Sequence, residues 1–168
     1  KTALGYIIEV ETTEGRQLFN LQSNRIITPF YYEESTSNAN YIYLSKAHFK
    51  TPFDPQKEQI ILPWEYSTVY NIPGSHNFAV KKDGLFGVVN SENKVLVPFI
   101  YEDMISTNRP NMLVITKNNQ YGIIDINNKL LYGMTDNCIE VHSDYFELKV
   151  PKANKIIQKL DYNLKEIK

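Results

Sequence analysis

The sequence predicts an all-β fold made of about five tandem units, and three observations lead to this prediction. A proline followed by an aromatic residue recurs at Pro29, Pro63 and Pro98, with spacings of 34 and 35 residues. A fixed period in this range is typical of repeat architectures. Short apolar stretches separated by turn residues fill the intervals, and no convincing amphipathic helix pattern is present. We therefore expect a single repeat domain over residues 1–168.

The recurring apolar stretches set the boundaries of the units. The predicted units cover residues 6–40, 41–77, 78–111, 112–145 and 146–168. Each should form three or four antiparallel strands and stack on its neighbours, because so few strands are not stable alone in water. We favour an open twisted array. The alternative is a closed five-bladed propeller, for which a repeat of about 34 residues is short, since a blade usually needs about 40.

The first two units depart most from the repeat. In the first, Glu14-Gly15 and Ser23-Asn24 mark two turns. In the second, Thr51-Pro52 and Asp54-Pro55 interrupt the middle of the unit. Because proline has no N–H to donate to a strand ladder, a regular second strand is doubtful there.

The third unit is the clearest copy. Residues 78–82 predict a strand, Asp83-Gly84 a tight hairpin turn, and residues 85–90 a second strand. Residues 94–97 predict a third strand, which Pro98 should end. A short fourth strand is expected from residue 99 to about residue 105.

The last two units follow the same order with more drift. The fourth has strand patterns over residues 112–117, 120–125 and 129–132, and Gly133-Met134 replaces its proline–aromatic pair. In the fifth, residues 152–168 have weak helical spacing, but Asp161-Tyr162-Asn163 indicates a hairpin turn, so we favour strands over a capping helix. The terminal units should present polar outer faces.

An aromatic–glycine pair marks the third and fourth units, as Phe86-Gly87 and Tyr121-Gly122. These pairs and the residues around them resemble the WG-repeat (KWG-repeat) family of bacterial proteins. The matching residues around the pairs are 82–85, 88–89, 94–98 and 101 in the third unit, and 120, 123–125 and 129–130 in the fourth. The family's tryptophan is Phe or Tyr here, and the other units lack the pair. The resemblance implies a non-catalytic repeat module used for interaction.

The repeated aromatic residues are expected to be structural. A large ring would fill the space between stacked units, and the adjacent glycine would let a neighbouring backbone or ring approach closely. The residues assigned to the repeat core are Phe30, Trp64, Phe86, Gly87, Phe99, Tyr121 and Gly122, with the three prolines Pro29, Pro63 and Pro98.

The composition excludes several classes of partner. The chain has 168 residues, 42% of them hydrophobic, which is enough for a core, and its formal net charge is −1. A nearly neutral chain has no long-range attraction for phosphate backbones, so we expect no nucleic-acid partner. The longest apolar stretch, residues 95–101, is too short for a membrane span. The sequence begins at Lys1 without methionine, which a removed export signal or an upstream domain would explain; we favour an exported or cell-envelope location.

No catalytic or metal-binding motif stands out, so we expect neither an enzyme nor a cofactor. The histidines, His48, His76 and His142, lie in different units without metal-ligand spacing. The single cysteine, Cys138, cannot form an internal disulfide. Cys138 and His142 are a nucleophile and a base close in sequence, but in a strand they would be roughly 13 Å apart.

Tyrosines and carboxylates at equivalent positions are the candidate binding residues. The chain has 12 tyrosines, a residue suited both to protein interfaces and to stacking on sugars. The carboxylates are either solvated charges that protect strand edges or an acidic face for a divalent metal or a basic partner, and with the rings they would form the contact surface. The candidates are Tyr32, Trp64, Tyr66, Tyr101, Glu34, Glu102 and Asp103. We expect a protein–protein interaction module; the alternative is a module that binds carbohydrate, such as cell-surface glycan.

Overall fold

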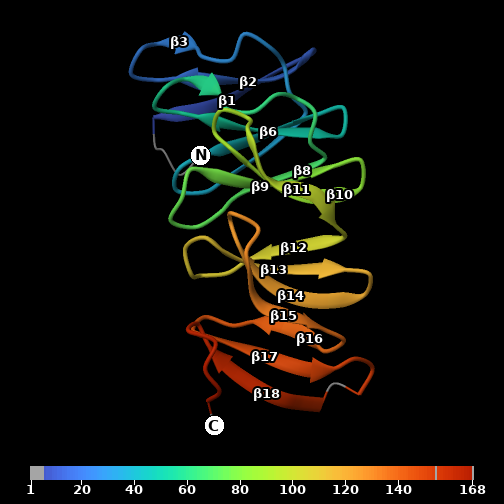
Figure 1. Cartoon of the computed structure of the whole chain (residues 1–168). Coiled ribbons are helices and arrows are strands. Elements are labelled where there is room, and N and C mark those ends of the chain that lie inside the picture. Colours follow the sequence, from blue (N-terminus) through green and yellow to red (C-terminus); the bar gives the residue numbers. More distant parts are fainter. Residues whose placement is uncertain (1–5, 154, 168) are drawn as a thin grey trace. The chain divides into compact units, whose positions relative to one another are not determined.

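The computed structural model of the protein describes residues 6–153 and 155–167, which form strands and no helix (Figure 1). The chain divides into two compact parts, Lys1–Val69 with Ser91–Asn93 and Tyr70–Asn90 with Lys94–Lys168. None of the described residues forms a helix that could cross a membrane.

Among the described residues, eighteen strands form five antiparallel sheets, as the repeat predicts, and each sheet is open. The first sheet has the order β1-β2-β3, the second β4-β5-β6-β7, the third β8-β9-β10-β11, the fourth β12-β13-β14-β15 and the fifth β16-β17-β18. The strands are β1 (Ile7–Thr12), β2 (Gly15–Asn20), β3 (Arg25–Ile26), β4 (Glu34–Ser37), β5 (Ile42–Lys46), β6 (Phe49–Asp54), β7 (Gln59–Ile60), β8 (Thr68–Asn71), β9 (Asn77–Lys82), β10 (Leu85–Asn90), β11 (Val95–Tyr101), β12 (Asp103–Ser106), β13 (Met112–Lys117), β14 (Gln120–Asp125), β15 (Leu130–Thr135), β16 (Cys138–Val141), β17 (Tyr145–Val150) and β18 (Lys155–Asp161).

Pro98 does not end its strand, contrary to the expectation from sequence. β11 continues through Pro98 to Tyr101, and the remainder of the expected fourth strand becomes β12, which belongs to the next sheet. β11 lies at the edge of its sheet, and its register with β10 shifts on both sides of the Val88–Val97 pair. An irregular edge strand does not need the N–H that proline lacks, so the proline is accommodated.

A regular strand also crosses Thr51-Pro52, where the sequence made one doubtful. Pro52 lies inside β6, and its carbonyl accepts a hydrogen bond from the amide of Ile61, on the side of β7. The N–H and C=O of one residue in an antiparallel strand point to the same side, so the N–H that Pro52 lacks would also have pointed toward β7. The hydroxyl of Thr51 donates to the carbonyl of Leu62 and supplies a donor there.

The C-terminal segment forms a strand and a turn, as we favoured. After β18, one side-chain oxygen of Asp161 accepts hydrogen bonds from the amides of Asn163 and Lys165, at 2.9 and 2.8 Å. The same turn, with an Asn or Asp side chain accepting from the backbone that follows, precedes the last strand of the other four sheets. Its first residues there are Asn20, Asp54, Asn90 and Asp125.

Within each of the two parts, neighbouring sheets share a buried apolar cluster. In the first part of the chain, Ile7 and Leu18 of the first sheet lie in one buried cluster with Leu44 and Phe53 of the second. A second cluster joins the third and fourth sheets, and a third joins the fourth and fifth. Since burial of apolar surface drives folding, these shared cores are what stabilise strands that could not stand alone.

The two end sheets differ, and only one has the expected polar outer face. Cross-strand partners share a face, so Ile8, Phe19 and Ile26 form one row across the first sheet. Ile8 and Phe19 are half-buried and Ile26 is exposed, so this outer row is apolar. The fifth sheet instead carries Glu147 on the face opposite Phe146, which packs inward.

Candidate functional site

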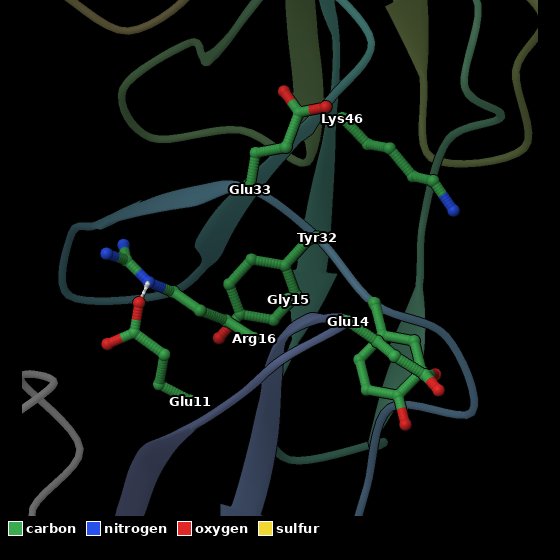
Figure 2. Close-up of a pocket in the computed structure, with 8 residues that line it drawn as sticks. Glu11, Glu14, Gly15, Arg16, Tyr32, Glu33 and Lys46 are labelled. Carbon is green, nitrogen blue, oxygen red and sulfur yellow. Dashed lines mark ion pairs between the residues drawn. The ribbon is translucent and has the colours of Figure 1, made fainter.

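Two neighbouring hollows on the first two sheets share Lys46. The first hollow, which we call the polar hollow, has a volume of about 390 Å³ and is lined mainly by charged residues, and Figure 2 shows the side chains that line it. The second has about 260 Å³ and is mostly aromatic. The polar hollow is lined by Glu11, Glu14, Gly15, Arg16, Tyr31, Tyr32, Glu33 and Lys46, and the aromatic hollow by Phe30, Lys46, Ala47, Phe49 and Trp64. We call the two together the Lys46 surface.

The aromatic hollow contains rings from both sheets. Phe30 follows the first sheet and Trp64 follows the second, and their ring centroids are 5.7 Å apart in an edge-to-face arrangement. Both are half-buried, whereas Phe49, at the start of β6, is 41% exposed. The packed rings of Phe30 and Trp64 therefore form the wall of the hollow, and the ring of Phe49 beside them is exposed to solvent.

The turn that carries Lys46 and Phe49 has an unfavourable backbone. Ala47 and His48 both have positive φ, at 48° and 70°, which non-glycine residues rarely adopt. The corresponding turn of the third sheet uses Asp83-Gly84, and that of the fourth uses two asparagines, residues that tolerate this conformation. Such strain persists only where the surrounding structure holds it, and it concentrates at functional sites.

The surface forms where the aromatic–glycine pair is replaced. Phe86 is paired with Tyr101, and the equivalent partners of Tyr32 and Tyr66 are Arg16 and Lys50. The position that holds the aromatic residue Phe86 in the third sheet is therefore held by a cationic residue, Arg16 or Lys50, in the first two sheets. In the first sheet this cation, Arg16, lines the polar hollow.

The glycine of the pair is replaced by a hydrogen-bonding side chain. A Cβ on Gly87 would lie only 2.7 Å from the carbonyl oxygen of Val97, so that backbone approaches closely, as expected. In the first sheet, Gln17 occupies the glycine's place and donates to the equivalent carbonyl, that of Thr28, at 2.9 Å. The Thr51 hydroxyl does the same in the second sheet.

The structure buries the candidate tyrosines. Tyr32, Tyr66 and Tyr101 are at most 7% exposed, and their hydroxyls donate to Glu9, Asn93 and Asn128 at 2.9, 2.7 and 2.6 Å; these residues fix the sheets rather than form a ladder of exposed rings. Burial, with a hydrogen bond to Glu9, raises the pKa of Tyr32, and burial raises that of Tyr66 to about 12. Of the four candidate rings, Trp64 lines the aromatic hollow and Tyr32 lines the polar one.

The candidate carboxylates lie outside the Lys46 surface. Glu102 accepts hydrogen bonds from the amides of Asn118 and Asn119, so it caps a hairpin turn of the fourth sheet. Asp103 accepts from the amide of the next residue, and Glu34 is exposed on β4. Glu33 accepts from the amide of Ala47 in the same way as Glu102 does from Asn118, so this one recurring carboxylate caps a turn in two sheets.

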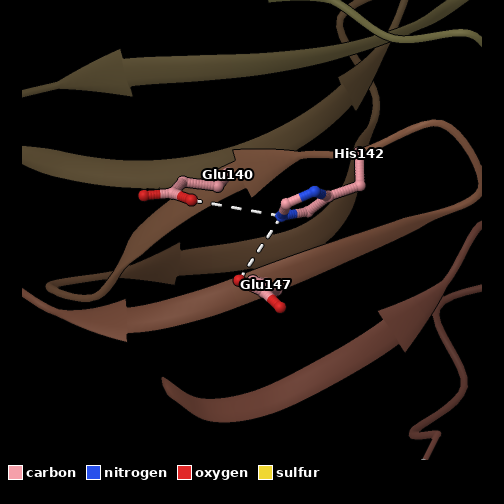
Figure 3. A group of neighbouring side chains, drawn as sticks. All are labelled: Glu140, His142 and Glu147. Carbon is pink, nitrogen blue, oxygen red and sulfur yellow. Dashed lines mark ion pairs between the residues drawn. The ribbon is translucent and has the colours of Figure 1, made fainter. Parts of the chain in front are cut away.

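A separate cluster of charged side chains covers the outer face of the fifth sheet. Nε2 of His142 lies 3.4 Å from Glu147 and 4.0 Å from Glu140 (Figure 3). The ligand atoms of these three residues lie within 4.8 Å of one another, which sequence spacing did not indicate. Lys149 pairs with both carboxylates and Lys159 pairs with Glu147 at 3.2 Å, so ammonium groups already neutralise them.

The electrostatics of this cluster favour ion pairs. Burial opposes ionisation of Glu147, but hydrogen bonds from Lys159 and Lys149 hold its pKa below the usual value. A hydrogen bond to Glu140 raises the pKa of Lys149. The network covers the outer face of the fifth sheet with paired charges.

Comparison with known proteins identifies the fold alone. No family model matches the sequence, and no curated protein matches it. Similar solved structures include a eukaryotic initiation factor (TM-score 0.62, 9% identity, 95% of this chain and 51% of that one). Hsv2 of Kluyveromyces lactis is also similar (0.54, 11%, 97% and 59%), as is the dihydro-heme d1 dehydrogenase NirN (0.50, 14%, 99% and 44%). The chain spans about half the length of these structures.

Sequence reasoning missed most of the Lys46 surface. Arg16, Lys46 and Phe49 follow or precede unremarkable turns and belong to no motif. One signal was available: an Arg stands at the position where the third unit has the aromatic residue of its aromatic–glycine pair. Finding it requires the strand register, because the first unit lacks the glycine that would align it.

Proposed function

We propose that the protein is a non-catalytic repeat module that binds a segment of another protein at the Lys46 surface. The observation that carries this proposal is an aromatic hollow with an exposed ring, Phe49, directly beside a charged hollow. Aromatic anchors with a polar rim are typical of the energetic centres of protein interfaces. The resemblance to interaction repeats agrees with this proposal.

The proposal is tested with a random peptide library displayed on phage and selected on the immobilised protein. We expect enriched peptides to change the fluorescence of Trp64, the single tryptophan of the chain. Phe49→Ala should abolish the enrichment, because it removes an exposed ring from the hollow while leaving the core intact. Leu85→Ala is the matched control: Leu85 begins the equivalent strand and is 36% exposed, but it lines neither hollow.

A carbohydrate ligand is the second candidate, favoured by the same rings. Phe30, Phe49 and Trp64 offer faces for stacking on a sugar, and Arg16 with Glu11 offers hydrogen-bonding groups nearby. A glycan array probed with the wild type and with Phe49→Ala distinguishes the two candidates. Glycan binding that Phe49→Ala removes, without any enriched peptide, would replace the protein-binding proposal.

A further inference from the structure

The Lys46 surface also indicates the chemistry of its partner, and this inference rests on the proposed function. The aromatic hollow has about 260 Å³, below the range of roughly 300–1,000 Å³ that is typical of sites for drug-sized ligands. It therefore suits one apolar side chain of a partner. Its lining of three aromatic side chains, Ala47 and the stem of Lys46 favours an aliphatic or aromatic group there.

The carboxylates beside this hollow already have donors from the protein itself. Glu11 pairs with Arg16 at 3.7 Å, and Glu33 accepts from the amide of Ala47 at 3.1 Å. A hydrogen bond to Glu14 raises the pKa of Tyr31, so that carboxylate is engaged as well. The acidic side chains of the polar hollow therefore do not demand a cation from the partner.

The ammonium group of Lys46 differs from them. Among the described residues it has no ion-pair or hydrogen-bond partner, although an ammonium carries three donors. It lines both hollows, and Figure 2 shows its side chain extending away from Glu33. The group that complements it is an anionic acceptor, and a carboxylate is the strongest that a protein segment offers.

The β5–β6 hairpin sets the distance between the apolar group and the anionic group that a partner must present. Lys46 and Phe49 are directly opposite in the β5–β6 ladder, so their side chains project from the same face. The strained Ala47-His48 turn holds them together. In an extended segment, residues two apart also project from one face, about 7 Å from each other.

We propose that the partner segment is extended and carries an apolar residue with an Asp or Glu two positions away. The apolar side chain enters the aromatic hollow beside Phe49 and Trp64. The carboxylate pairs with Lys46 at the boundary of the polar hollow.

The phage selection described above tests this proposal when it is run in parallel on the wild type and on Lys46→Glu. On the wild type we expect an apolar residue with an acidic one two positions away. On Lys46→Glu we expect the apolar preference to persist and the acidic preference to be lost. Lys117→Glu is the control, because Lys117 holds the equivalent place before the β13–β14 turn and lines neither hollow; it should select as the wild type does.

A synthetic peptide made from the enriched sequence then gives the magnitude. Replacing its acidic residue by the amide should weaken binding to the wild type about fivefold, the upper range for one exposed ion pair, and should not weaken binding to Lys46→Glu. Peptides with an apolar anchor and no acidic preference would overturn this inference and leave the proposed function standing. Failure to enrich any peptide over Phe49→Ala would overturn both.

Discussion

Replacing Gly87 by alanine tests why an aromatic residue is followed by glycine in this repeat. The new Cβ would lie 2.7 Å from the carbonyl oxygen of Val97 and 3.1 Å from Cδ1 of Phe99. A carbonyl in a strand cannot move as a flexible side chain can, so the cost belongs in the upper half of the roughly 1–3 kcal/mol range for overpacking. The reduced entropy of the unfolded chain returns about 0.4–1 kcal/mol. We expect a net loss of about 2 kcal/mol, or roughly 4–8 °C in Tm for a chain of this size.

Alanine substitutions at two further glycines give reference values for the loss of stability expected of Gly87→Ala. At Gly133 no atom lies within 4 Å of an added Cβ, so Gly133→Ala should leave the stability unchanged or slightly raised. At Gly122 the nearest atom, at 2.6 Å, is the sulfur of Met134, a flexible side chain that can move, so Gly122→Ala should have an intermediate cost. Urea unfolding followed by circular dichroism, with hydrogen exchange of the β10 amides, measures all three. Equal stability of the Gly87 and Gly133 variants would refute the reasoning.

Four other perturbations have expected outcomes. Because burial raises the pKa of Tyr66 from 10.0 to about 12, its contribution to stability is complete below pH 10 and falls between pH 10 and 12, which an alkaline titration of tyrosinate absorbance checks. The pKa of Glu147 lies below its usual 4.5, so the Tm advantage of the wild type over Glu147→Gln should hold above pH 4.5 and shrink as the pH falls below it. Replacing Ala47-His48 by Asn-Gly should stabilise the protein by about 1–2 kcal/mol in urea unfolding, because it relieves two positive-φ residues. Tyr101→Phe should cost about 1 kcal/mol in the same assay, through the lost bond to Asn128.

Periodicity and turn residues were enough to predict the sheets. The alternating stretches around Asp83-Gly84 form β9 and β10, and the turn joins the two strands as expected. What the sequence could not show is which strand joins which sheet. β11 and β12 are separated only by residue 102, and no local property of Pro98 reveals that the sheet changes after it rather than at it.

The candidate site was harder to predict, because burial depends on stacking. Tyr32, Tyr66 and Tyr101 look like interface residues by type and position. Nothing in their spacing shows that their hydroxyls donate hydrogen bonds to Glu9 and to asparagines of other turns, 23–27 residues away. Trp64 directly follows Pro63 in the same repeat ending, yet it is half-buried, and its ring meets that of Phe30 edge-on.

The departures from the repeat locate the site better than the repeat itself does. Where the aromatic–glycine pair is present in the third sheet, Phe99 packs closely on Gly87. Where a hydrogen bond from Gln17 or Thr51 holds the equivalent carbonyl, no glycine is needed. The ring after the proline then packs on another ring, as Phe30 and Trp64 do, and a hollow lies beside them. The substitutions that weaken the motif in the first two units thus coincide with the hollows of the Lys46 surface.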